Sequence, residues 1–167
     1  MYNPIVISNY FVQKSLQTGI ELTPMKLLKL VYLSHGWYLA FYDRPLISEA
    51  VLAWRYGPVI KSVYIKFKFY GKCQIESLAD IDGDGVISNT EVMPSDPAIC
   101  RFLDQVWERY SQYNGLQLSD LTHQDGSPWS NTKNRNGEGA IISTDSIKEY
   151  YRQILNTDGT TVQPTTT

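Results

Sequence analysis

The sequence predicts a mainly α-helical domain with a small β element, of the α+β class, packed around a central buried helix at about residues 24–41. Three observations predict it. A nearly unbroken apolar run, TPMKLLKLVYLSHGWYLAFY, extends from Thr23 to Tyr42. Segments on both sides of it repeat apolar residues with the 3.6-residue period of a helix, and one short stretch near residue 54 alternates like a strand. A chain of 167 residues is long enough to bury one core.

The central helix has a clear start and an apolar surface nearly all round. Thr23 can accept a hydrogen bond from the first turn, and Pro24 loses nothing there by lacking an N–H. Such a helix belongs in the middle of a domain or in a membrane. Lys26, Lys29 and His35 would each be costly in a bilayer, so the run predicts the inner helix of a soluble protein.

A first helix is predicted before it. Asn3-Pro4 is a helix start, and Gly19 is a suitable stop. The apolar residues between them, which we expect on one face, are Ile5, Phe11, Val12 and Leu16. After the central helix, the sequence Asp43-Arg44-Pro45 predicts a turn.

The β element and a third helix come next. Leu52, Trp54 and Tyr56 alternate with smaller or charged residues, which favours a short, half-buried strand. We expect Gly57-Pro58 to end that strand, with Pro58 in the first turn of a helix that continues to about Tyr70 and stops at Gly71.

Residues 72–96 contain few apolar groups and many acids, so they predict an inserted acidic loop or a hairpin. A helix then begins at Asp96-Pro97 and ends before Gly115. Its apolar residues follow the i, i+3, i+4, i+7 pattern and are Ile99, Phe102, Leu103, Val106, Tyr110 and Tyr113.

The last third of the chain is predicted to hold two helical pieces. Ser119 is a suitable cap for one short turn, and residues 125–140 are predicted to form a loop broken by Pro128-Trp129. A final helix starts at Ser143 or Thr144 and buries Ile147, Tyr150, Tyr151 and Ile154. We therefore expect one domain over residues 1–155 and a disordered tail over residues 156–167.

The charge and the cysteines limit the classes of partner and compartment. A formal charge of −2 gives no electrostatic reason to expect nucleic acid or an anionic membrane as a partner. The first residues do not resemble a secretory signal, and Cys73 and Cys100 form no CxxC pair. We expect reduced thiols and a cytoplasmic protein.

One short motif predicts a calcium site. The segment DIDGDGVISNTE, residues 80–91, fits the calcium-loop pattern at every position, and calcium is the candidate cofactor. However, Pro94 and Pro97 would stop the exiting helix, and no second calcium-binding hand is visible, so an acidic surface loop is the alternative. The predicted ligands are Asp80, Asp82, Asp84, the Val86 carbonyl, Ser88 and Glu91.

No catalytic constellation is evident, and we predict that the protein is not an enzyme. The two histidines, His35 and His123, have no G-x-S-x-G, H-E-x-x-H or phosphate-binding glycine loop near them. Each is better explained by a structural hydrogen bond. The basic and aromatic run from Lys61 to Lys72 is better explained by an ordinary amphipathic helix than by a nucleic-acid surface.

Four stretches together resemble the SocA-like antitoxin family, also called the Panacea domain, of bacterial and prophage toxin–antitoxin loci. They are TPMKLLKLVYLSHGWYLA, ISEAVLAWRYGPVIKSVYIKFKFYG, FLDQVWERY and LSDLTHQDGSPW, and the likeness covers about residues 4–155. The most specific parts are the AW-x-YGPV block at residues 53–59 and the TH…PW block, which contains Thr122, His123, Pro128 and Trp129.

The resemblance implies an antitoxin that neutralises a cognate toxin of a type II-like system by direct protein–protein binding, with delivery to a protease as a second mode. Toxin and protease are thus the expected partners. Trp37, Tyr56 and Trp129 are the predicted contact residues, because aromatic anchors dominate many interfaces; for Trp54 core packing is favoured. The alternative function is a calcium-binding protein, or a phage-encoded interaction protein that uses residues 80–91.

Overall fold

The structure is a computed structural model that describes residues 1–81 and 91–158. The described residues confirm a mainly α-helical fold with a small β element. The elements in chain order are α1 (Pro4–Thr18), α2 (Pro24–Tyr42), β1 (Val51–Trp54), β2 (Gly57–Ile60), α3 (Lys61–Phe67), the 3₁₀ helix η1 (Lys68–Tyr70), α4 (Pro97–Tyr110), α5 (Gly115–Thr122), α6 (Pro128–Asn136), β3 (Ile141–Ile142) and α7 (Thr144–Asp158).

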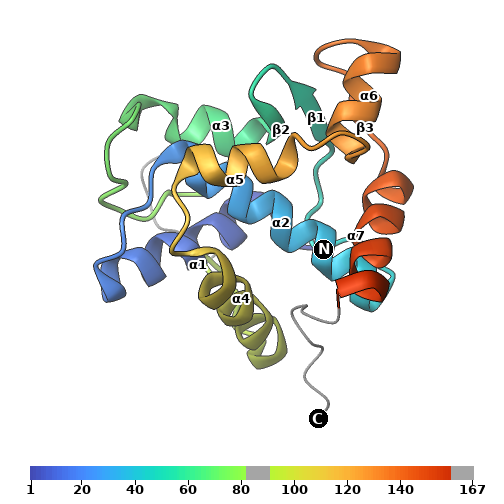
Figure 1. Ribbon diagram of the computed structural model, residues 1–167. Helices are drawn as coiled ribbons and strands as arrows, with labels where there is room; N and C mark the ends of the chain where they lie inside the picture. The colour runs from blue at the N-terminus through green and yellow to red at the C-terminus, as the bar shows by residue number, and fades with distance from the viewer. Residues whose placement is uncertain (82–90, 159–167) are drawn as a thin grey trace.

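Helix α2 passes through the middle of the molecule and is covered on all sides, as predicted (Figure 1). It packs against α1, α3, α4, α5, α7 and β2. Every residue from Lys26 to Ala40 is buried, and Leu30 and Val31 have no exposed surface at all. Within the described residues, no helix is long and apolar enough to cross a membrane. Because its residues are buried, the apolar run forms the core of the domain.

The β element is a three-stranded antiparallel sheet in the order β2-β1-β3. Here the prediction for Gly57-Pro58 was wrong, because these residues begin β2 and the helix starts only at Lys61. Pro58 lies opposite Ala53, whose own N–H and C=O bond to residues 140 and 139 on the other side of β1. Ala53 and Pro58 thus form a non-hydrogen-bonded pair of the antiparallel ladder, so the lack of an N–H on proline costs no ladder hydrogen bond.

The predicted loop at residues 125–140 was also wrong in part, because α6 occupies residues 128–136. Ser127 accepts a hydrogen bond from the Ser130 N–H, and Pro128 occupies the first turn. The starts of α1, α2 and α4 use the same arrangement of a polar cap followed by proline. Only Pro128 and Ser130 of this helix are buried, so its sequence carries no apolar stripe that would reveal it.

Two smaller boundaries and the exposure of one residue also differ from the prediction. Helix α5 starts at Gly115, not at Ser119, because Asn114 caps it and exchanges hydrogen bonds of 2.9 and 2.8 Å with Gln117. Helix α7 continues through Asp158, three residues into the predicted tail. Leu16, expected on the buried face of the first helix, is 50% exposed.

The segment that follows η1 is tied to α1. Its described parts, residues 72–81 and 91–96, contain neither helix nor strand. The buried Asn9 side chain donates hydrogen bonds to the carbonyls of Ala79 and Val92, at 2.8 and 3.0 Å, and accepts one from the Ala79 N–H. One side chain therefore holds Ala79 and Val92, two residues within the inserted segment, against α1.

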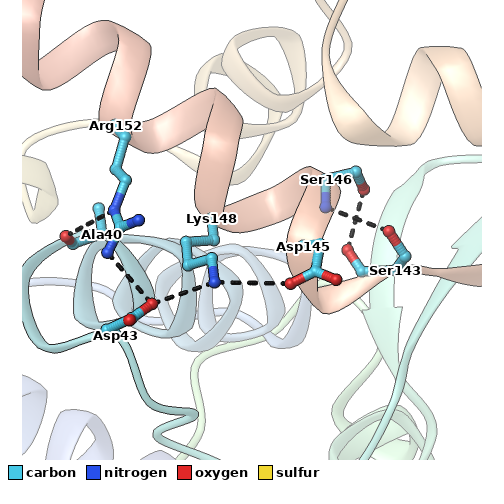
Figure 2. A network of polar contacts seen from close by, with 7 residues as sticks. All are labelled: Ala40, Asp43, Ser143, Asp145, Ser146, Lys148 and Arg152. Atoms are coloured by element: carbon cyan, nitrogen blue, oxygen red, sulfur yellow. Dashed lines mark hydrogen bonds and ion pairs between the residues drawn. The ribbon is translucent and has the colours of Figure 1, made fainter.

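Helix α7 lies along the second half of α2, and polar contacts join them at one end (Figure 2). The Asp43 carboxylate lies 3.0 Å from Lys148 Nζ and 3.1 Å from Arg152 Nη2, and Arg152 Nε donates to the Ala40 carbonyl. The hydrogen bond from Lys148 and the charges of both cations lower the pKa of Asp43. Asp43 is largely exposed, so these contacts orient α7 more than they stabilise it.

Candidate partner-binding surface

The turn between β1 and β2 is held from inside by side chains of three helices. This turn consists of Arg55 and Tyr56. Trp129 Nε1 of α6 donates to the Trp54 carbonyl at 2.7 Å. Ser119 Oγ of α5 donates to the Tyr56 carbonyl at 3.1 Å. Because these donors come from separate elements, the turn is fixed to the body of the domain.

Lys29 of α2 supplies the third attachment. Its Nζ donates to the Tyr56 carbonyl at 2.8 Å and to the Pro58 carbonyl at 3.2 Å, and the side chain is only 1% exposed. No carboxylate pairs with it in the described residues. Burial therefore lowers the pKa of Lys29 to about 7. The carbonyl oxygens are its only polar partners among those residues.

Gly57 allows this close approach. A Cβ at this position would lie 2.4 Å from Lys29 Nζ and 2.8 Å from His123 Nε2, and the backbone has φ +110°. His123 in turn stacks on Trp129, with ring centroids 4.1 Å apart. Burial, followed by the charge of Lys29, lowers the pKa of His123, so the neutral ring is favoured. The AW-x-YGPV and TH…PW segments thus meet over Lys29.

The outer side of the turn is exposed and carries aromatic and cationic groups. Tyr56 is 63% exposed, and the Arg55 guanidinium lies 5.5 Å from its ring. Lys133 Nζ lies 4.7 Å from the Trp129 ring. Trp54 contacts Tyr64 edge to face. We call these residues the hairpin-tip surface: Trp54, Arg55, Tyr56, Tyr64, Trp129 and Lys133. Tyr, Trp and Arg are the residue types that most often dominate binding energy at protein interfaces.

Two of the three predicted contact residues belong to this surface. Tyr56 and partly buried Trp129 lie on it, whereas Trp37 is in the core. Trp37 Nε1 donates to the Tyr110 hydroxyl at 2.8 Å, and its ring packs 4.9 Å from that of Tyr151. At 2% exposure, Trp37 is therefore not part of the hairpin-tip surface.

Most of the predicted calcium ligands lie outside the described residues. These are Asp82, Asp84, Val86 and Ser88. Of the other two, Asp80 forms an ion pair with Lys66, and Glu91 accepts a hydrogen bond from the Ser95 N–H at 2.6 Å. Residues 1–81 and 91–158 contain no group of three or more side chains suited to a metal ion. Calcium binding by residues 80–91 stays a prediction.

Neither histidine is part of a hydrogen-bonded catalytic group in the described chain. His35 is 3% exposed, its Nδ1 has no partner there, and burial lowers its pKa to about 4. His123 Nε2 is likewise buried with no partner among these residues. The structural hydrogen bond expected at each histidine is thus not made by His35 Nδ1 or His123 Nε2 within the described residues, and burial, which lowers both pKa values, favours the neutral rings.

The buried Lys29 predicts a rise in stability with pH. Its pKa is about 7 in the folded protein against 10.5 ordinarily, so between these values the unfolded chain binds a proton that the folded protein does not. Urea unfolding of the wild type is expected to give about 2 kcal/mol more stability at pH 9 than at pH 7, relative to Lys29→Met. Parallel pH dependences for the two proteins would contradict the assignment.

Comparison of the sequence with known proteins finds two matches. A family model described as "Antitoxin SocA-like, Panacea domain" matches residues 27–130, more than half of the chain. The Antitoxin SocA of Caulobacter vibrioides (strain NA1000 / CB15N) is 29% identical over 153 residues, which cover 87% of this chain and 80% of that protein. No solved structure matches. The matched region includes Lys29, the hairpin and Trp129.

Proposed function

Because the chain belongs to the SocA-like antitoxin family with the Panacea domain, we propose that it neutralises a cognate toxin of a type II-like toxin–antitoxin system by direct binding. The family match over residues 27–130 is the observation that carries this proposal. Binding alone is sufficient for such a role, so the protein acts without catalysing a reaction. We assign the interaction to the cytoplasm.

The hairpin-tip surface supports direct binding. Its backbone carbonyls are held by Lys29, Ser119 and Trp129, so little conformational freedom is lost when a partner docks. Tyr56 and Trp129 supply aromatic anchors at this surface. A toxin bound at this surface is neutralised in one of two ways: the bound antitoxin masks it, or the antitoxin delivers it to a protease.

Co-expression tests the proposal. Products of the neighbouring genes are expressed in a bacterial host with and without this chain. We expect one product to arrest growth alone, growth to be restored with the chain, and the two proteins to purify together. An unchanged toxin level indicates masking, and a level that falls only when a host protease is present indicates delivery. The proposal fails if no neighbouring product is toxic alone and rescued by this chain.

A further inference from the structure

We propose that the β1–β2 turn inserts Arg55 and Tyr56 into an acidic recess on the toxin, and that Lys29 is the positioning residue that holds the turn in its binding form. This assignment rests on the antitoxin function proposed above. It adds the part of the surface that makes contact and the chemistry of the partner. Three features of the described residues support it: the direction of the turn, its charge, and its attachment to α2.

The turn points outward because its inner side is occupied. The Tyr56 carbonyl accepts hydrogen bonds from Lys29 and Ser119, both buried, while the Tyr56 side chain is 63% exposed. Figure 1 shows the β1–β2 turn protruding at the top of the domain beside α6. A rigid turn with an exposed aromatic side chain is suited to enter a recess, because little entropy is lost on docking.

The charge of the tip points to an acidic partner. Over residues 1–81 and 91–158, neither Arg55 nor Lys133 forms an ion pair; each lies over an aromatic ring instead. In the described residues Lys14, Lys66, Lys148 and Arg152 are paired with aspartates, and the two cations of the tip are among those that have no acidic partner there. The chain as a whole carries −2, so this surface is locally opposite in sign. Arg55 is free to form a two-pronged bond with a carboxylate.

A hollow elsewhere on the domain offers an alternative docking site. It has a volume of about 630 Å³ and lies where α5 and α7 both pack on α2, lined among others by Trp37, Tyr113 and Tyr150. Arg109 and Asp120 both line it, so it carries no preference for one sign of charge. No feature of the hollow indicates which partner would occupy it. Binding of the toxin there is therefore the alternative outcome of the experiment.

The test measures binding of the toxin identified by co-expression, using calorimetry at about 50 and 300 mM salt. Arg55→Glu is expected to weaken binding about a hundredfold at low salt and less at high salt. Tyr56→Ala is expected to weaken it at least about tenfold at both. The matched controls are Arg101→Glu, an exposed arginine on α4, a helix that lies away from the β1–β2 turn (Figure 1), and Tyr113→Ala in the hollow. Both should bind within about twofold of the wild type.

Lys29→Met tests the positioning role. Methionine keeps most of the apolar stem and removes the bonds to the Tyr56 and Pro58 carbonyls. We expect cooperative unfolding and an unchanged circular dichroism spectrum, but about tenfold weaker binding. The salt dependence should equal that of the wild type, because Lys29 is buried and does not meet the toxin. Should Lys29→Met not fold, Ser119→Ala removes the other bond to the Tyr56 carbonyl and is expected to weaken binding in the same way.

The outcomes separate the inference from the proposed function. If the wild type rescues growth and Arg55→Glu and Tyr56→Ala bind as tightly as it does, the tip is not the contact and the inference is overturned while the antitoxin function stands. Loss of binding in Tyr113→Ala alone would place the toxin in the hollow and also overturn it. Absence of any rescue by the wild type removes the proposed function itself.

Discussion

Gly36→Ala is expected to destabilise the protein by about 3 kcal/mol. The sign is opposite to that of helix propensity, because replacing glycine with alanine inside a helix ordinarily stabilises it by about 1 kcal/mol. A Cβ on Gly36 would lie 2.3 Å from Cε2 of Tyr151 and 2.8 Å from its Cζ. The Tyr151 ring has no room to move away, because it is buried with centroids 4.9 Å from Trp37 and 6.1 Å from Tyr32. Urea unfolding measures the change.

The control for this prediction is a double-mutant cycle. In a Tyr151→Leu background the ring is gone, so Gly36→Ala should cost much less there, and the two substitutions should not add. A rise in stability for Gly36→Ala alone would contradict the close packing of α7 on α2. That result would mean that helix propensity, and not contact with Tyr151, decides the residue at this position.

Gly57→Ala is expected to cost about 3 kcal/mol of stability and to abolish the growth rescue proposed for this chain. At φ +110° any residue with a Cβ is strained, and that Cβ would also meet Lys29 Nζ at 2.4 Å and His123 Nε2 at 2.8 Å. Both groups would have to move, which breaks the attachment of the Tyr56 carbonyl to α2. Urea unfolding and growth rescue in the co-expression assay measure the two effects.

Gly19→Ala separates backbone strain from contact. Gly19 also has positive φ, +71°, but nothing lies within 4 Å of the Cβ position. This substitution should therefore cost only about 1 kcal/mol and leave growth rescue intact. If Gly57→Ala matches Gly19→Ala in both measurements, the contact of the turn with Lys29 has no role in neutralisation.

Local signals in the sequence were enough to predict most of the helices. A polar cap before proline fixes the starts of α1, α2 and α4. Apolar periodicity predicts five of the six buried residues of α4, but it misses Trp107 and includes Tyr113, which lies beyond the helix and is 47% exposed. Strand β2 and helix α6 were missed because their stability depends on distant contacts. Pro58 is tolerated in a strand only because Ala53 bonds to residues 139 and 140, and α6 has no apolar stripe of its own.

The candidate site was predictable only in part. Tyr56 and Trp129 were expected to be contact residues because of their residue types. They lie on one surface because the Trp129 indole donates a hydrogen bond to the carbonyl of Trp54, which is 75 positions away in the sequence. Lys29 looked like an interruption of an apolar helix, and nothing in the sequence shows that its amine meets the carbonyls of the hairpin turn. Such placement follows from the tertiary packing of α2, α5 and α6 around the hairpin.

Because Asn9 donates hydrogen bonds to the carbonyls of both Ala79 and Val92, the stretch between these residues is a suitable place to insert additional sequence. With both stems anchored to α1, lengthening or replacing that stretch changes the closure entropy only slowly, by about 0.6 kcal/mol per doubling of length. We therefore expect the domain to accept a foreign epitope or reporter peptide between these two anchored residues with little loss of stability.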